Sequence, residues 1–208
     1  MYFPVSLKLK GRRCLVVGGG AVALRKAKAL LEAGAKVTAV APRFGAAFEK
    51  LKDKIVLRRK RYSGPDLHGC TFVVAATSDA ELNARVARDA GKRRVFANIV
   101  DAPGISDVII PATMRRGDFT ISVSTGGASP ILAGKIRRAL EKKFPASWGG
   151  YVDLLGEIRA TVRKGGFSAA RKKDILRGLL DKRGFEIYRK RGKAAARAFL
   201  AKNICGIV

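Results

Sequence analysis

Residues 14–23 read Cys-Leu-Val-Val-Gly-Gly-Gly-Ala-Val-Ala and join a short apolar run to a helical pattern. The run at residues 14–17 has the character of a buried strand, and the apolar residues from Ala23 to Leu31 recur at helical spacing. The stretch therefore predicts a strand, a tight turn and a helix. Its pattern Gly-x-Gly-x-x-Ala is typical of a dinucleotide-binding turn.

Each position of this pattern has a physical task. Gly18 permits the turn, Gly20 lets the backbone approach a pyrophosphate, and Ala23 allows the helix to pack closely on the strand. The amide groups at the start of the helix, around Ala21 and Val22, and the positive end of the helix dipole are expected to face the phosphates. The alternative is a plain connection between a strand and a helix.

The second predicted strand bears on the choice of nucleotide. The first helix is expected to end at Gly34, and residues 36–40 read as a parallel strand. An Asp or Glu that binds the ribose of NAD usually lies about 20 residues past the glycines, but this strand is followed by Pro42-Arg43. Arg43 has two interpretations: it pairs with a 2′-phosphate and favours NADP, or it flanks the adenine as a solvated loop residue.

The pattern of strand, polar end and helix repeats further along the chain. We expect a leading strand at residues 5–10, a helical stretch at 46–51, strands at 55–58, 71–76 and 95–100, and a helix at 79–92. Ligands of an open parallel sheet bind beyond the carboxyl ends of its strands. The polar residues predicted at those ends are Thr77, Ser78, Asp79, Asn98 and Asp101.

The pattern changes after residue 111. Residues 115–118 predict a turn and residues 119–124 alternate with strand period, which indicates an antiparallel pair. The loop at 124–130 then leads into a helix through Lys143, with Ser129 as its N-cap. Consecutive amides in this loop are suited to bind a carboxylate or phosphate, and the alternative is a simple helix cap.

The remaining residues predict three helices, at 150–163, 168–180 and 185–201. They are separated by Gly165-Gly166 and by Gly184.

Composition indicates a folded protein. The chain has 208 residues, 48% of them hydrophobic, with no run of the roughly 20 apolar residues that a membrane span needs. Its start lacks the layout of a signal peptide, so we expect a soluble, cytoplasmic protein. Cys14, Cys70 and Cys205 are scattered and are expected to be reduced, and His68, the only histidine, is expected to be an exposed turn residue. The sequence predicts no metal site.

The charge implies an anionic partner. The formal net charge is +27, of which residues 1–150 carry +17 and residues 151–208 carry +10. Because the excess is spread over the whole chain, it does not describe a neutral domain with a basic arm. The charge alone has three interpretations: the protein binds a polyanionic small molecule, it binds nucleic acid, or its surface is heavily solvated.

Four motifs occur together in one order: Gly-Gly-Gly-Ala-Val-Ala at 18–23, Val-Val-Ala-Ala-Thr-Ser-Asp at 73–79, Asn-Ile-Val-Asp-Ala-Pro at 98–103, and Ser-Thr-Gly-Gly-Ala-Ser-Pro at 124–130. This set resembles the precorrin-2 dehydrogenase family, which includes the N-terminal part of siroheme synthases. The resemblance covers roughly residues 1–145. Its members oxidise precorrin-2 to sirohydrochlorin with NAD, and some also insert ferrous iron.

The resemblance implies an α/β fold in three parts. These are a Rossmann NAD-binding domain at 1–112 with a parallel sheet, a small α+β dimerisation region at 113–145, and a helical C-terminal region at 146–208. It also implies a homodimer whose strands pair between subunits.

The resemblance further assigns roles to residues. Asp101 is the implied catalytic residue, and the implied cofactor is NAD, held by Gly18, Gly20, Ala21, Val22, Pro42, Arg43 and Thr77. We assign substrate binding to Asn98, Ser124, Thr125, Gly126, Gly127 and Ser129. Since NAD-using relatives also lack an acid at the second strand, the NADP interpretation of Arg43 is weakened. Precorrin-2 carries eight carboxylates, which gives the basic surface a partner.

Two other functions compete with the enzyme. One is a non-catalytic module that senses a nicotinamide nucleotide and binds a partner through its basic tail. The other is nucleic-acid binding, against which the chain shows no zinc-finger, RRM or KH signature.

Overall fold

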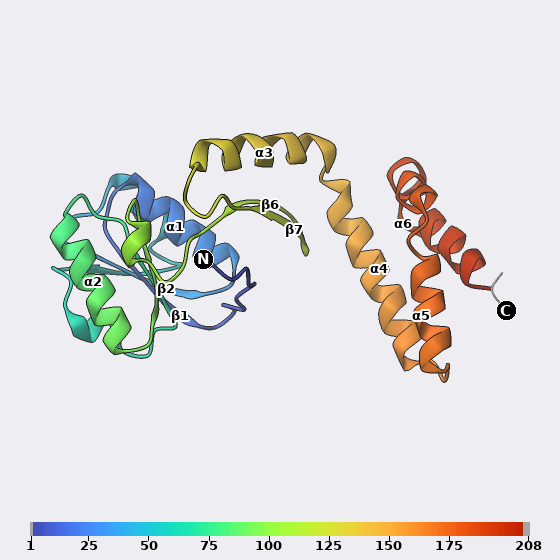
Figure 1. Ribbon diagram of the computed structural model, residues 1–208, viewed down its shortest axis with the longest axis horizontal. Coiled ribbons are helices and arrows are strands. Elements are labelled where there is room, and N and C mark those ends of the chain that lie inside the picture. Colours follow the sequence, from blue (N-terminus) through green and yellow to red (C-terminus); the bar gives the residue numbers. More distant parts are fainter. Residues whose placement is uncertain (1, 206–208) are drawn as a thin grey trace. The chain divides into compact units, whose positions relative to one another are not determined.

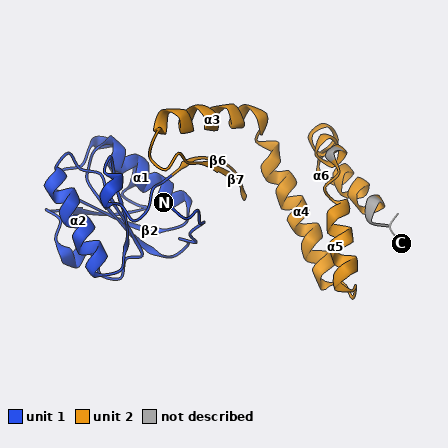
Figure 2. Cartoon of the chain, viewed as in Figure 1, with its two compact units in different colours: residues 1–110 blue, residues 111–208 orange. Residues whose placement is uncertain are grey.

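The computed structural model describes residues 2–205, except for the side chains of Lys182 and of residues 203–205. The chain forms two compact units, residues 1–110 and residues 111–208 (Figure 2). The antiparallel pair and the C-terminal helices both lie within residues 111–208, and their division into a dimerisation region at 113–145 and a helical region at 146–208 stays a prediction. Each unit is described by itself.

The first unit is a five-stranded parallel sheet with strand order β3-β2-β1-β4-β5. Figure 1 labels β1 and β2 of this sheet together with the helices α1 and α2. The strands are β1 (Arg13–Val17), β2 (Lys36–Ala41), β3 (Val56–Arg59), β4 (Phe72–Ala75) and β5 (Phe96–Ile99). The α-helices are α1 (Ala21–Glu32) and α2 (Ala80–Lys92), and the 3₁₀ helices are Ala46–Leu51, Gly64–Leu67 and Pro103–Ile105. The predicted α/β class, the parallel sheet and its strand–helix repeats are confirmed.

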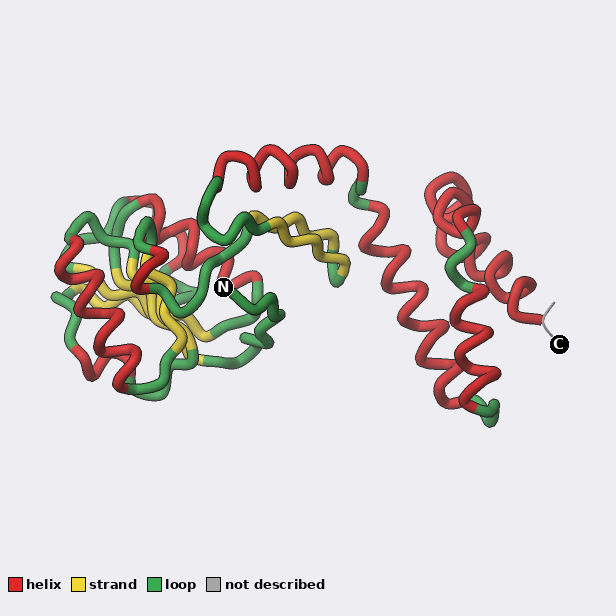
Figure 3. The backbone as a smooth tube through the Cα atoms, viewed as in Figure 1, coloured by secondary structure: helices red, strands yellow, loops and turns green. Residues whose placement is uncertain are grey.

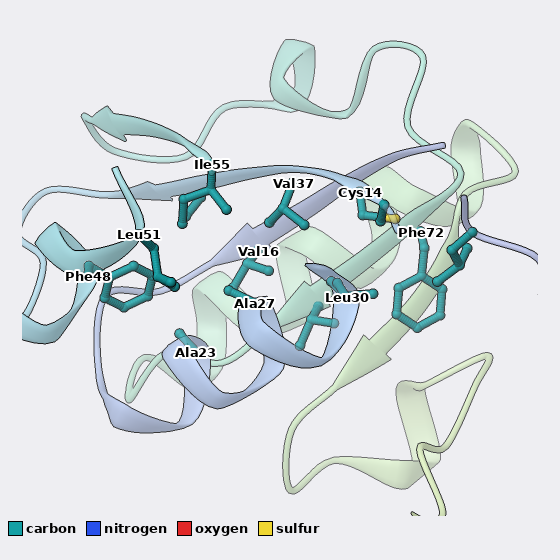
Figure 4. Packing of buried hydrophobic residues seen from close by; sticks show 14 residues of the cluster. Cys14, Val16, Ala23, Ala27, Leu30, Val37, Phe48, Leu51, Ile55 and Phe72 are labelled. Atoms are coloured by element: carbon teal, nitrogen blue, oxygen red, sulfur yellow. The ribbon is translucent and has the colours of Figure 1, made fainter. Parts of the chain in front are cut away.

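The two faces of the sheet are buried by different helices. Val16 faces the cluster that contains Ala23 and Ala27 of α1, as Figure 4 shows. Its neighbour Val17 faces the opposite cluster, with Val86 of α2. Side chains alternate along a strand, so an unbroken apolar run fits a sheet that is covered on both sides. This explains why the predicted strands read as continuous apolar runs.

The predicted leading strand at residues 5–10 is wrong, because this segment is not a strand. Both edges of β1 are already occupied, by β2 and β4, so the preceding segment has no partner beside the strand that it leads into. Leu9 alone of this segment is buried, in the cluster beneath α1. An alternating apolar pattern therefore does not form a strand where no neighbouring strand has an edge left to pair with.

The second unit begins with an antiparallel hairpin and continues with helices (Figure 3). Its elements are β6 (Ala112–Arg116), β7 (Phe119–Val123), α3 (Pro130–Lys143), α4 (Ser147–Lys164), α5 (Ala169–Gly178) and α6 (Lys182–Cys205). The predicted hairpin and α3 are present, but the turn is shorter than the predicted 115–118, because Arg115 and Arg116 belong to β6. α4 packs against α5 and α6 around a core that includes Leu154, Ile175 and Leu200.

The expected separation of the last two helices at Gly184 is displaced, because α5 ends at Gly178 and α6 begins at Lys182. Gly184 lies in the first turn of α6, where a side chain has little room: an added Cβ would lie 2.6 Å from the Tyr151 hydroxyl oxygen. α6 itself is interrupted at Gly192, whose φ of 82° is outside the helical range. Glycine at position 184 therefore serves close packing rather than a helix end.

The described thiols are buried or partly buried. Burial raises the pKa of Cys14 to about 11, and the nearby Cys70 adds to this. Burial also raises the pKa of Cys70. The side chain of Cys205 lies outside the described residues.

A buried carboxylate holds the connection between β3 and β4. Asp66, with a side chain only 2% exposed, accepts hydrogen bonds from Lys60 Nζ at 2.7 Å, Arg58 Nη1 at 3.1 Å and the Ser63 amide at 2.9 Å. Burial alone would raise the pKa of Asp66, but these hydrogen bonds and charges outweigh it and lower the pKa. The ionised form is therefore stabilised by folding.

We expect Asp66→Asn to lower the free energy of unfolding at pH 7 by about 1–3 kcal/mol, because charged donors lose their acceptor. Since the folded pKa of Asp66 lies below its unfolded value, its contribution is present above about pH 4 and is lost as the pH falls through the folded pKa. Urea unfolding at pH 7 and pH 3 measures both effects. Asp53→Asn, at an exposed site, is the control, and an equal loss in both variants would contradict the account.

Candidate functional site

Three of the predicted polar segments follow neighbouring strands of the sheet. β1, β4 and β5 are adjacent, with Val17 opposite Ala75 and Ala75 opposite Ile99. The glycine turn, the segment from Thr77 and the loop with Asp101 follow these strands. Because the strands are parallel, all three segments lie at the same edge of the sheet, where ligands of this architecture bind.

The three glycines of the turn have different environments. Gly18 has a φ of 130°, and a Cβ there would lie 2.4 Å from the Ala76 carbonyl oxygen. A Cβ on Gly19 would lie 2.0 Å from the Arg43 carbonyl oxygen, whereas a Cβ on Gly20 would meet nothing within 4 Å. Gly18 and Gly19 are thus required by the protein itself. Gly20 faces open space, as expected of a residue that a ligand approaches.

The start of α1 fits an anionic group such as a pyrophosphate. Its N-cap is Gly20, which offers no side chain to the first amides, and the first turn contains no acidic residue. Ala21 and Val22 are exposed, while Ala23 is fully buried against the sheet. The helix therefore has uncapped amide groups at its positive end, next to a turn without side chains.

The loop after β2 is fixed to the glycine turn. The Gly45 amide donates to the Gly19 carbonyl oxygen at 2.9 Å. Pro42 and Arg43 lie in this loop with exposed side chains, and no acid ends the strand. The contact with Gly19 was not foreseen from the sequence, since the glycine pattern assigns that position no role.

A polar network shapes the end of β4. Thr77 Oγ1 lies 2.8 Å from Asn83 Oδ1, and Asn83 Nδ2 donates to the Thr77 carbonyl oxygen at 3.0 Å. Asp79 is the N-cap of α2, because its carboxylate accepts from the Leu82 amide at 2.9 Å. Asn83, which is buried, therefore positions Thr77 at the edge of the sheet. In the sequence, Asn83 is only a polar residue on an amphipathic helix, which does not single it out.

Asp101 is exposed and has a φ of 59°, in the left-handed region that aspartate and asparagine tolerate. Its charge acts on Lys26, a half-buried residue of α1. Burial lowers the pKa of Lys26 and the neighbouring Arg25 lowers it further, while Asp101 opposes this. Lys26 is a cation beside the predicted catalytic group that the sequence pattern did not single out.

The loop that carries Asp101 is anchored on both sides. Ser106 Oγ accepts from the Ile99 amide at 2.9 Å and lies 3.0 Å from the Ala102 carbonyl oxygen. Asp107 accepts from the Ala97 amide at 3.1 Å. The side chains of Ser106 and Asp107 thus accept hydrogen bonds from the β5 backbone, where a neighbouring strand would otherwise do so. They hold the loop that carries Asp101 against the end of β5.

Asn98 supports this loop from inside the unit. It is 7% exposed, and its Nδ2 donates to the Val108 carbonyl oxygen at 2.8 Å. Its Oδ1 is buried without a hydrogen-bond partner in the structure. The residue predicted to bind substrate therefore has its amide nitrogen engaged with the protein.

The predicted loop of residues 124–129 belongs to the second unit. Ser129 caps α3, as expected, by accepting from the Leu132 amide at 3.3 Å, and Thr125 Oγ1 accepts from the Ser129 amide at 2.9 Å. Ser124 Oγ accepts from the Gly126 amide at 3.2 Å. Gly126 and its neighbour Gly127 have φ angles of 64° and 93°. Three hydroxyl groups thus shape the loop.

The described residues contain neither a metal cluster nor a membrane-spanning helix. The described His, Cys, Asp and Glu side chains form no group of three that would hold a metal ion, and His68 is exposed. No described helix combines the length and the apolar composition needed to cross a bilayer.

The first unit is therefore a Rossmann-type domain with a nucleotide-binding turn. Residues 5–112 match the family model NAD_binding_7, described as "Putative NAD(P)-binding", and residues 116–143 match the central model of sirohaem biosynthesis proteins. The chain belongs to the precorrin-2 dehydrogenase family of siroheme biosynthesis. It binds a nicotinamide cofactor.

Individual relatives agree with this. The solved structure titled "SirC, precorrin-2 dehydrogenase" is similar over 97% of this chain and 100% of its own, with a TM-score of 0.76 and 30% identity. A siroheme synthase of Pseudomonas fluorescens (strain SBW25) is 42% identical over 166 residues, which are 78% of this chain and 35% of that protein. Siroheme synthase 2 of Aeromonas hydrophila is 35% identical over 207 residues, 100% of this chain and 40% of that protein. The chain thus spans about a third of the length of the siroheme synthases that it resembles.

Proposed function

We propose that this protein is an NAD-dependent dehydrogenase that oxidises precorrin-2 to sirohydrochlorin. The observation that supports the proposal is that the glycine turn follows β1 and the loop of Asp101 follows β5, so that both lie at the carboxyl end of the same parallel sheet. A nicotinamide cofactor, when bound, supplies the acceptor for a hydride. The protein then has to bind the nucleotide, hold the substrate and accept a proton.

The residues divide these tasks. Gly18, Gly20, Ala21 and Val22 form the turn and amide cradle for the pyrophosphate, with Pro42, Arg43 and Thr77 at its borders. Asp101 takes the proton that the substrate loses, an effect typically worth about 10²- to 10⁴-fold for a general base. Lys26 of α1 supplies a positive charge that interacts with the charge of Asp101. Ser124 to Ser129 shape a loop in which the Gly127 amide is suited to a carboxylate, and Asn98 supports the loop of Asp101.

The test is an anaerobic assay with purified protein and precorrin-2. The formation of sirohydrochlorin with NAD, and its absence without a nucleotide, is the expected result. The sensing module is the competing candidate, and it predicts nucleotide binding without turnover. Binding of NAD with no oxidation of precorrin-2 would therefore favour the module over the enzyme.

We also propose NAD rather than NADP as the cofactor. We expect kcat/KM to be higher with NAD than with NADP. Arg43→Ala should change kcat/KM for NAD by less than about threefold, because NAD has no 2′-phosphate for the guanidinium to bind. Steady-state kinetics with both nucleotides measure this. A wild-type preference for NADP that Arg43→Ala abolishes would contradict the proposal.

A homodimer is the proposed assembly. β6 and β7 form a sheet of only two strands, whose outer edges have no partner strand among the described residues. On α3, Ile131 is 84% exposed and Leu132 and Ile136 are exposed as well, while Ala133 is the one described residue of this helix that is buried. A two-stranded ribbon and an apolar helix face of this kind are marginal in water and are stabilised by a second subunit.

We expect light scattering to give about twice the mass of the 22.3 kDa chain. Ile131→Glu with Ile136→Glu should give the mass of one chain, because the charges face the partner. Leu180→Glu, at an exposed leucine outside α3, is the matched control and should leave the dimer intact. A wild-type monomer, or a dimer that survives both glutamates on α3, would rule out this interface.

A further inference from the structure

A groove with a cationic rim lies between α4 and α5 in the helical part of the second unit. Five basic side chains line it: Arg159 and Arg163 from α4, and Lys172, Lys173 and Arg177 from α5. These residues take no part in the nucleotide cradle or in the loop of Asp101. The groove therefore calls for an explanation of its own.

The positive charge of the groove is largely uncompensated. Arg177 lies 3.9 Å from Asp174, and both side chains are more than half exposed. Among the described ion pairs, none involves the other four basic side chains of the groove. Glu157 of α4 pairs instead with Lys193 and Arg197 of α6. Like charges that share a groove without counter-charges repel one another, and an anionic ligand relieves that repulsion.

Apolar side chains lie between these cations. Leu176 of α5 is half-buried in the groove, and Leu180, just after the helix, is 74% exposed. Ala169, the first residue of α5, adds a small apolar side chain. A ligand that matches this lining has an apolar face and several negative charges around it.

We propose that the α4–α5 groove is a binding site for a polycarboxylated tetrapyrrole. The carboxylates pair with the basic rim, and the macrocycle lies over Leu176 and Leu180. This inference rests on the proposed function, because it takes its ligand from the compound class of the substrate and product. The lining of the groove shares no residue with the nucleotide cradle or with the loop at 124–129, so it is proposed as a second site for that class.

Nucleic acid fits the groove less well. Single-stranded chains bind through bases stacked on aromatic side chains, and the described lining contains none. α5 has 10 residues and spans about 15 Å, so a polynucleotide would meet the groove through only a few phosphates. A compact ligand with carboxylates around its rim can instead form ion pairs with all five basic side chains at once.

The test uses uroporphyrin, a stable tetrapyrrole with eight carboxylates, and the full chain in a fluorescence titration. The triple variant Arg159→Gln, Arg163→Gln, Lys173→Gln removes cations that have no described partner and spares Lys172, which donates to the Arg163 carbonyl oxygen. We expect it to lose one bound uroporphyrin per chain, or to raise the Kd of that site about tenfold or more.

The matched control is Arg189→Gln, Lys190→Gln, Arg191→Gln, which removes the same charge from exposed residues of α6 outside the groove. It should change the Kd less than about twofold. Circular dichroism melting of both variants verifies that the helices remain folded. Equal weakening in both variants, or none in either, would overturn the proposal.

Two further arms identify the ligand. Coproporphyrin, with four carboxylates, should bind more weakly than uroporphyrin, and a short single-stranded RNA should not displace uroporphyrin at equal concentration. Displacement by the RNA would overturn the assignment to a tetrapyrrole. The oxidation assay remains independent: an unmodified protein that turns over precorrin-2 but binds no uroporphyrin in the groove refutes this site alone, and groove binding without turnover refutes the proposed enzyme alone.

Discussion

Replacement of Asp101 by asparagine is expected to lower kcat for precorrin-2 oxidation about 10²- to 10⁴-fold, the range that a general base contributes. The amide cannot accept the proton, but it keeps the size of the carboxylate. Asparagine also tolerates the left-handed backbone that Asp101 adopts, with a φ of 59°. The fold of the loop and the Kd for NAD should therefore change little, by less than about threefold.

The matched control is Asp79→Asn, at the end of the neighbouring strand β4. Asp79 caps α2, and asparagine is as good an N-cap as aspartate. Its activity should stay within about threefold of the unmodified protein. Calorimetric NAD binding and anaerobic single-turnover rates on both variants separate chemistry from binding. Full activity of Asp101→Asn, or an equal loss in Asp79→Asn, would refute the role of Asp101.

The glycine turn gives the second large expected effect, with opposite signatures at two adjacent positions. Gly19→Ala should destabilise the protein, by roughly 1–3 kcal/mol or more, because its Cβ meets the backbone of the loop after β2. Gly20→Ala should leave the free energy of unfolding nearly unchanged, because its Cβ enters open space. It should nevertheless weaken NAD binding about tenfold or more, since that space is where the pyrophosphate approaches.

Urea unfolding and NAD titration of the two variants measure this contrast. Each variant is the control of the other, because both add the same methyl group to the same turn. Normal stability of Gly19→Ala would contradict the close approach of the Arg43 carbonyl oxygen. Normal NAD affinity of Gly20→Ala would place the nucleotide elsewhere.

The sheet was predictable because its signals are local. β1 and β4 are apolar runs, and their burial on both faces requires no knowledge of the rest of the chain. The same reasoning failed at residues 5–10, since a strand also needs a free edge. It failed again at Gly184, because close packing against Tyr151 and a helix end both favour glycine.

The candidate site divides in the same way. The glycine turn and the cap at Ser129 depend on a few consecutive residues, and the sequence predicted both. Lys26 and Asn83 act through contacts that only the folded chain creates, and neither lies in a recognisable motif. Asn98 was expected among the polar residues at the carboxyl ends of the strands. Its side chain is instead buried, because successive side chains along β5 point to opposite faces of the sheet.

The stoichiometry of one anaerobic reaction tests the central claim most directly. Precorrin-2 is mixed with excess NAD and the purified protein, and sirohydrochlorin and NADH are followed together by their absorbance. The account predicts that the two appear in equal amounts and at the same rate, and that both form about 10²- to 10⁴-fold more slowly in Asp101→Asn. Sirohydrochlorin that forms without NADH, or NAD that binds without either product, would contradict it.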